Sequence, residues 1–198
     1  RIGEKIVGSL LAGVAEDVRT DVLLPNGRGG WTQVDHLALM PSGIWVVETK
    51  NYQGRIFGKA RQKTWTQKLG RQKNQFQNPL HQNYGHLKAL EASLPDTPIH
   101  GLVVFSNQAQ FPKGRPEGVV QARDLATHLQ EADEGGTVPL ALQAKWDALA
   151  HRIRTDPESR KAHLAQVGAL SRQQLIRWLA VVQLVLGTLF FIGSRVVL

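Results

Sequence analysis

Residues 46–54 of this chain read VVETKNYQG, and this stretch decides how the whole sequence is interpreted. Val46 and Val47 are apolar and β-branched, which is typical of a buried strand. Glu48 and Lys50 follow at alternate positions, so both side chains project to the same face of an extended strand. The residues YQG at 52–54 then favour a turn. A buried strand that ends in an acid and a cation is a candidate functional site.

The flanking sequence predicts an α/β domain. Apolar residues at helical spacing indicate a helix over residues 3–14, and further helices are expected to begin near 79 and 124 and to cover 139–154. Strands are expected over residues 21–25, 31–40, 43–50, 55–58, 99–106 and 119–120. The run at 99–106 is continuously apolar, as in a strand that is covered on both faces.

The helix that begins near residue 79 has a clear start signal. Asn78 is expected to cap it, with Pro79 at the first helical position. Its apolar face is predicted to consist of Leu80, Tyr84, Leu87, Leu90 and Leu94.

Composition limits the classes of protein that the chain can represent. Its 198 residues are 42% apolar and 20% charged, as in folded proteins, and carry a net charge of +8. The absence of cysteine excludes disulfides, thiolate zinc sites and cysteine nucleophiles. We expect one domain over residues 1–150, followed by a basic linker over 151–177.

Residues 178–194 read WLAVVQLVLGTLFFIGS and contain no charged side chain. A bilayer core requires about 20 apolar residues, with a lower limit of about 17, so this segment is a candidate transmembrane helix. The basic residues before it would keep the domain on the cytoplasmic side of the cell membrane, as a single-pass protein. The alternative is a hydrophobic helix buried against the domain of a cytoplasmic protein.

Asp35 lies on the strand that precedes Glu48, and a hairpin brings the two strands together. The register decides whether Asp35 shares a face with Glu48 and Lys50. A three-residue loop at 41–43 pairs Asp35 with Thr49, which is on the opposite face. A two- or four-residue loop, or a bulge, places Asp35 opposite Glu48 or Lys50. The sequence leaves these alternatives open, and we predict convergence on one face.

Convergence would place two carboxylates, of Asp35 and Glu48, where they can bind Mg²⁺ or Mn²⁺. Such an ion activates water and stabilises charge on a phosphate, and Lys50 would orient the water or balance that charge. Glu4 in the first helix could supply a third acid. Each residue also has a structural explanation, because surface ion pairs are common and an acid near a helix N-terminus favours the helix dipole.

Seven Lys and Arg residues and no Asp or Glu lie between positions 55 and 73. Such a segment is suited to phosphate groups, and an aromatic ring among the charges could stack on bases. The candidate nucleic-acid-binding residues are Arg55, Lys59, Arg61, Lys63, Trp65, Lys68, Arg71 and Lys73. The alternatives are a solvated face without a partner and a surface that faces anionic lipid.

Several motifs occur together in a recognisable order: Gly3 and Glu4, QVDHLALMPSGIWVVETKNYQGRIFG, Trp65, NPLHQN and VVFS. Over about residues 1–130 they resemble the nuclease-related domain family, NERD, which is grouped with the PD-(D/E)xK nucleases. The resemblance implies a restriction-endonuclease-like core, with a mixed central β-sheet flanked by helices. Val34 rather than proline precedes Asp35, so the chain resembles a variant of the superfamily pattern.

The resemblance also implies functional residues. It implies a catalytic set of three acids and a lysine: Glu4, Asp35, Glu48 and Lys50. Three further polar residues match recurrent positions whose role the sequence does not assign: Gln33, Asn78 and Gln82. Membership of the family implies nuclease activity by similarity only, because a fold does not fix an activity.

The histidines do not form a metal motif. His81 and His86 are five residues apart rather than four, and no HExxH sequence occurs. His36 follows Asp35 directly and therefore points to the opposite face. We interpret the histidines as structural, with His81 and His86 the best placed to touch a ligand.

The leading hypothesis is a nuclease that depends on Mg²⁺ or Mn²⁺ and acts on nucleic acid, which we expect to be DNA rather than RNA. It would be tethered to the cytoplasmic face of a membrane by residues 178–194, and it could form a homodimer where both strands are cut. One alternative is a catalytically silent nucleic-acid-binding domain. Another is a membrane-anchored interaction protein.

Overall fold

The structure is a computed structural model that describes residues 2–27, 29–133, 135–165 and 168. It divides into two units, Arg1–Thr155 and Asp156–Leu198. In the second unit, residues 157–165 are helical. The apolar segment 178–194 lies outside the described residues. Among the residues that are described, no helix is both long enough and apolar enough to cross a bilayer.

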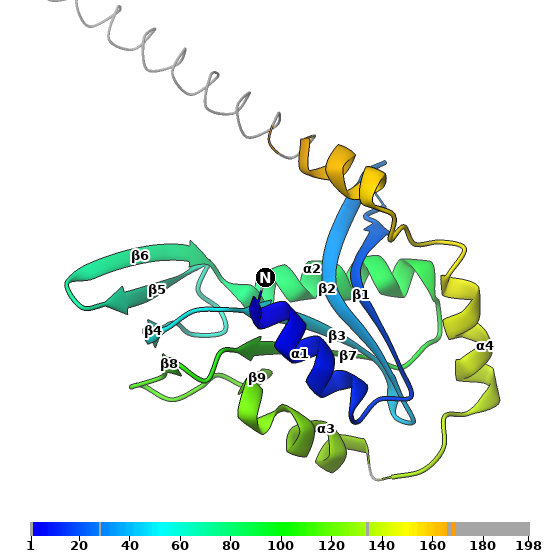
Figure 1. The fold of residues 1–198 in the computed structure, drawn as a ribbon, viewed down its shortest axis with the longest axis horizontal. Helices are drawn as coiled ribbons and strands as arrows, with labels where there is room; N and C mark the ends of the chain where they lie inside the picture. The colour runs from blue at the N-terminus through cyan, green and yellow to red at the C-terminus, as the bar shows by residue number, and fades with distance from the viewer. Residues whose placement is uncertain (1, 28, 134, 166–167, 169–198) are drawn as a thin grey trace, which may run out of the picture. The chain divides into compact units, whose positions relative to one another are not determined.

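The first unit is a mixed α/β structure around a five-stranded sheet of order β1-β2-β3-β7-β9 (Figure 1). Strands β1 to β3 pair in antiparallel fashion, whereas β7 lies parallel to both β3 and β9. The sheet is therefore mixed, as expected. Its strands are β1 (Asp17–Pro25), β2 (Trp31–Met40), β3 (Gly43–Lys50), β7 (Ile99–Phe105) and β9 (Val119–Gln121).

Helices cover both faces of this sheet. Helices α2 (Pro79–Ser93) and α4 (Leu140–Leu149) pack on one face, in a core that includes Leu37 and Val46. Helices α1 (Ile2–Ala12) and α3 (Leu125–Asp133) pack on the other, in a core that includes Trp45 and Val47; a short 3-10 turn, η1 (Ala122–Asp124), precedes α3. Strand β7 is covered on both faces, as its continuous apolar sequence predicted.

Helix α2 begins as predicted, but its buried face differs from the prediction. Tyr84 is 59% exposed, whereas the polar residues Asn83 and His86 are buried. The side-chain amide of Asn83 donates to the carbonyls of Val46 and Leu102 and so fastens the helix to β3 and β7. Of the predicted apolar face, Leu80, Leu87, Leu90 and Leu94 do pack against the core, and only Tyr84 does not. The count of apolar residues missed Asn83 and His86 because these polar residues have partners beneath the helix.

Helix α4 is shorter than the predicted segment 139–154. After Leu149 the chain leaves the helix, and Arg154 forms a two-way backbone bridge with Leu23 of β1. The sequence gives no sign of this pairing, because it joins residues that are far apart along the chain.

A second, four-stranded sheet has the order β6-β5-β4-β8. Its strands are β4 (Gly54–Phe57), β5 (Thr64–Leu69), β6 (Gln72–Gln77) and β8 (Ala109–Gln110). Of these four strands, the sequence predicted only β4. The β5–β6 hairpin is rich in Gln and Lys and poor in β-branched residues, so it lacks the usual strand signal.

Trp65 on β5 is a core residue. It is 1% exposed and stacks on Phe105, with ring centroids 6.1 Å apart. The expectation that Trp65 stacks on bases is therefore wrong, because no face of its ring is open to a ligand.

Asn78 has a structural role that the sequence only partly revealed. Its side-chain oxygen accepts a hydrogen bond from the Leu80 amide, which caps α2. Its side-chain amide donates to the carbonyls of Ala60 and Gln62, at 2.8 and 2.7 Å, and so fixes the basic β4–β5 loop. A single buried side chain thus joins the start of α2 to that loop.

We predict that Asn78→Ala lowers the free energy of unfolding by about 3 kcal/mol, because it removes a helix cap and two hydrogen bonds to the β4–β5 loop, each contributing about 1 kcal/mol. Urea unfolding measures this change. The matched control Asn74→Ala, at an exposed position of β6, should shift stability by no more than about 0.5 kcal/mol. Equal effects of the two substitutions would contradict the role of Asn78.

Candidate active site

The register of the β2–β3 hairpin brings Asp35 to Glu48. Met40 pairs with Gly43, so the turn contains two residues, and the ladder runs back to His36 opposite Val47. The next residue on each strand is Asp35 and Glu48, which therefore lie across from each other. The Thr49 amide donates to Asp35 Oδ2 at 2.8 Å. Of the alternatives that the sequence left open, this is the two-residue turn.

The β1–β2 ladder is interrupted at the same level. Thr20 pairs with His36 and Val22 with Val34, but the intervening Asp21 and Asp35 do not pair. Asp21 has a left-handed backbone (φ 56°), and its Oδ1 accepts a hydrogen bond from Gln33 Nε2 at 2.5 Å. Such conformations are costly outside glycine and concentrate at functional sites. Gln33, whose role the sequence left unassigned, holds this irregular segment.

Glu48 is buried, 3% exposed, and has a cationic partner. Lys50 Nζ lies 2.6 Å from its Oε1 and also donates to Gln82 Oε1 at 2.9 Å. Gln82, the third unassigned polar residue, therefore positions Lys50. Since strand side chains alternate, Glu48 and Lys50 share one face of β3, as the sequence predicted.

His86, on α2, contacts Glu48. Its Nε2 lies 3.3 Å from Glu48 Oε2, and its Nδ1 lies 3.0 Å from Thr32 Oγ1. The contact is within ion-pair distance, and His86 lowers the pKa of Glu48. His81, in contrast, is exposed. Sequence reasoning did not connect His86 with Glu48, although Gln82 and His86 are four residues apart and hence on one helix face.

The pKa values of the two carboxylates are shifted in opposite directions. Burial and the charge of Glu48 raise the pKa of Asp35 to about 6, against the lowering effect of the Thr49 amide. Burial would also raise the pKa of Glu48, but His86 and Lys50 outweigh it and hold that pKa below its ordinary value. Glu48 therefore remains ionised at pH values at which Asp35 takes up a proton. Diverging pKa values in neighbouring carboxylates are typical of catalytic sites.

Glu4, in the first turn of α1, is close enough for its charge to raise the pKa of Asp35 further. Its side chain makes no direct contact with Asp35, Glu48 or Lys50 that would complete a cluster. In the part of the chain that is described, no three acidic, histidine or cysteine side chains are grouped closely enough to hold a metal ion. Three of the four expected catalytic residues are thus brought together, with the fourth in electrostatic range.

A cavity of about 380 Å³ opens beside Lys50, between the start of α1 and the ends of β3 and β7. Polar side chains line it, including Asn51, Ser106 and Gln108. Gly3 also lines it, and a Cβ at that position would lie 2.9 Å from Cβ of Asn51. A glycine is therefore required for α1 to approach β3 this closely.

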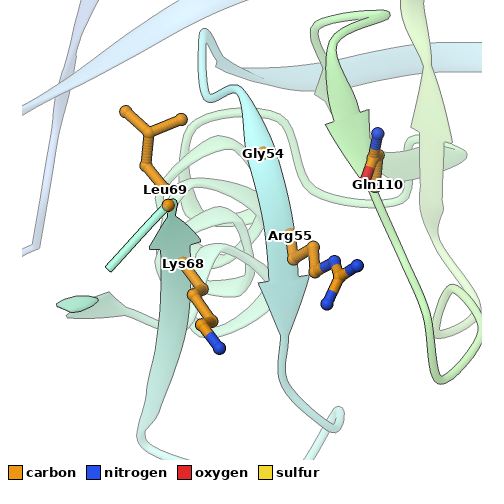
Figure 2. Close-up of a pocket in the computed structure, with 6 residues that line it drawn as sticks. Gly54, Arg55, Lys68, Leu69 and Gln110 are labelled. Atoms are coloured by element: carbon orange, nitrogen blue, oxygen red, sulfur yellow. The ribbon is translucent and has the colours of Figure 1, made fainter. Parts of the chain in front are cut away.

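The basic residues lie on the second sheet. Arg55 pairs directly with Lys68, and Lys68 with Lys73, so three cations form a row across β4, β5 and β6. Arg55 and Lys68 also line a cavity of about 370 Å³, which Gln110 closes on the β8 side (Figure 2). Like charges directly opposite each other on neighbouring strands are destabilising. The remaining basic residues are exposed in the β4–β5 loop and the β5–β6 turn: Lys59, Arg61, Lys63 and Arg71.

These features define a mixed α/β domain with a partly buried acid–acid–lysine site. The chain belongs to the NERD (nuclease-related domain) family, whose model matches residues 1–106. Membership is consistent with the PD-(D/E)xK superfamily, although the match ends before the residue 130 that we expected. The family is described as nuclease-related.

One relative is an uncharacterized protein of Bacillus anthracis, which is 43% identical over 94 residues. The alignment covers 46% of this chain and 44% of the relative. The chain thus spans less than half the length of the curated relative that it matches. No solved structure matches the chain.

We predict that Asp35→Asn raises the free energy of unfolding by about 2 kcal/mol at about pH 7.5 without divalent cations. The folded state disfavours ionised Asp35, whose pKa is raised from 3.8 to about 6, and asparagine keeps an oxygen for the Thr49 amide. The folded wild type binds this proton more tightly than the unfolded chain. Its stability should therefore fall as pH rises from about 4 to about 6, and the difference from the variant should vanish below about pH 4.

Urea unfolding at several pH values measures this effect. Asp124→Asn is the matched control, because Asp124 is 39% exposed in an ion pair with Arg115. It should change stability by no more than about 0.5 kcal/mol. A loss of stability in Asp35→Asn at about pH 7.5 would contradict the electrostatic interpretation.

Proposed function

We propose that this chain is a metal-dependent nuclease with a restriction-endonuclease-like core, and that it hydrolyses phosphodiester bonds in DNA. The observation that carries the proposal is the convergence of Asp35 and Glu48, with Lys50 bonded to Glu48. An acid pair beside a lysine at the end of a buried strand fits the chemistry of phosphate hydrolysis. Membership of a nuclease-related family supports the same reading.

The donor set suits Mg²⁺ or Mn²⁺. Mg²⁺ is usually held by one or two carboxylates together with waters and substrate phosphates, and Asp35 and Glu48 would supply two. Their mutual repulsion, which raises the pKa of Asp35, is a cost that a divalent cation would relieve. When bound, the ion would lower the pKa of a water and stabilise the charge that develops on the phosphate.

The chain's own side chains would position the reacting groups. An ammonium has three N–H donors, and Lys50 directs two of them to Glu48 and Gln82. We assign the third to a phosphate oxygen or to the attacking water. The Thr49 amide and His86 hold the two carboxylates in place, and Glu4 would add negative charge at the mouth of the site.

The remaining parts of the proposal concern substrate and location. The cationic residues of the second sheet and its loop would hold the phosphate backbone, which supports nucleic acid as the substrate. We further propose that residues 178–194 anchor the protein to the cytoplasmic face of the cell membrane, because their sequence has the composition and length of a span. A homodimer would allow two sites to cut both strands.

Cleavage assays test the catalytic part. Glu48→Gln and Lys50→Met should each lower the rate of plasmid cleavage in Mg²⁺ or Mn²⁺ by at least about 100-fold, since each removes charge stabilisation at the phosphate. Glu91→Gln and Lys88→Met are matched controls, because this exposed ion pair lies on α2 away from the site.

The controls should cleave at the wild-type rate. Equal rates in all four variants would remove Glu48 and Lys50 from the mechanism. If the wild type binds DNA without cutting it in either metal, the domain is a catalytically silent binding module instead.

Membrane anchoring has its own test. The full chain should stay in the membrane pellet after alkaline carbonate washing, and Leu186→Arg should release it, since a central arginine costs insertion about 3 kcal/mol. Leu149→Ala, which weakens the core of the first unit instead, serves as a control and should leave the protein in the pellet. Release of the wild type by carbonate would contradict the anchor.

A further inference from the structure

Strands β5 and β6 form a hairpin at the edge of the second sheet, where β5 also pairs with β4. This hairpin, called the ribbon below, extends from the rest of the first unit (Figure 1). Leu69 pairs with Gln72, so a two-residue turn joins the strands, and Gly70 in that turn has a left-handed backbone (φ 58°). Trp65 and Phe76, which are paired across the strands, face the core beside Phe105. The opposite face of the ribbon is therefore the outer one.

The outer face carries polar and basic side chains in cross-strand pairs. Residues directly opposite each other share a face, and the outer pairs are Thr64 with Gln77, Thr66 with Gln75, and Lys68 with Lys73. Four of these six residues are exposed, and the other two, Thr66 and Lys68, are partly buried. No Asp or Glu occurs between residues 49 and 90. The face thus offers hydroxyl, carboxamide and ammonium groups without any negative charge.

We propose that this outer face enters the major groove of duplex DNA. The groove of B-form DNA admits a two-stranded β-ribbon, and carboxamides, hydroxyls and lysines are the side chains that read its base edges and phosphates. Arg55, Lys68 and Lys73 form a row of like charges. A bound polyanion would relieve the repulsion among them. The inference deepens the proposed function, on which it rests, by naming B-form duplex DNA as the substrate.

The ribbon is fastened to the candidate active site. Only residues 51–53 separate β3 from β4, and Gln67 on β5 donates to the carbonyl of Gln53 at 2.9 Å. The Ser106 amide donates to the carbonyl of Lys50, and the Gly54 amide to that of Gln108, both at 3.0 Å. DNA held by the ribbon would therefore be held at a fixed position relative to Lys50.

Fluorescence anisotropy with the full chain in EDTA tests this interface, because no cleavage can then obscure binding. The probes are one B-form DNA duplex, the same duplex with a bulky glucosyl group on C5 of its cytosines, and a duplex RNA of equal length. The C5 substituent fills the major groove and leaves the phosphates and the minor groove unchanged. We expect the unmodified DNA to bind at least about tenfold more tightly than either other probe, since the A-form major groove is too narrow for side chains.

Two variants locate the contact. Gln75→Ala should weaken binding to unmodified DNA by about tenfold, whereas Asn74→Ala, on the inner face of the same exposed strand, should leave it unchanged. The double variant Lys68→Gln and Lys73→Gln should reduce the slope of log affinity against log salt by about 2, as for two lost phosphate contacts. Melting temperatures at or above the wild-type value for all variants would show that the fold is intact.

The outcomes separate this interface from the nuclease activity. Equal affinity for the modified DNA or the RNA would overturn the major-groove contact, as would equal effects of Gln75→Ala and Asn74→Ala. Displacement of the DNA by phosphatidylserine vesicles with no effect of Gln75→Ala would indicate a lipid surface and also overturn it. Groove binding by Glu48→Gln at wild-type affinity would support the interface whether or not the wild type cuts DNA.

Discussion

The close approach of a buried and a partly buried carboxylate is the constraint on which the rest of the site depends. Asp35 and Glu48 lie opposite each other where the β2–β3 ladder ends, and each is held by a separate donor set. The Thr49 amide stabilises Asp35, while Lys50 and His86 stabilise Glu48. Burial of like charges is unfavourable unless such partners are present. The partners are distributed so that Glu48 stays ionised while the pKa of Asp35 is raised.

Helix α2 supplies partners for both Glu48 and Lys50. Its buried face includes Asn83 and His86, and Gln82 lies beside them, facing the end of β3. An apolar α2 would pack against the sheet equally well, but it would leave Lys50 and Glu48 without their hydrogen-bonding and electrostatic partners. The amphipathic pattern of α2 is therefore weak because part of its inner face is polar by necessity. Stability and function are combined in one helix, which is why its polar residues could not be assigned from spacing alone.

The second sheet combines an apolar inner face with a basic outer face beside the candidate active site. Its inner face adds Trp65 and Phe76 to the core, and its outer face places like charges in direct opposition. That opposition lowers the stability of the isolated domain, and a polyanionic partner would reverse the effect. The three residues between β3 and β4, together with the hydrogen bonds of Ser106 and Gln67, join this surface to the strand that carries Lys50.

The sequence by itself determined the local features: the strands 31–40 and 43–50, the cap at Asn78, and the shared face of Glu48 and Lys50. These follow from period, turn chemistry and capping, which act over a few residues. The tertiary structure alone decided that Asp35 meets Glu48, since one residue of turn length reverses the face. It alone decided that His86 lies beneath Glu48, that Trp65 is buried and that the Gln- and Lys-rich run at 64–77 forms a hairpin. Those outcomes depend on contacts between distant segments, whose free energies no local pattern contains.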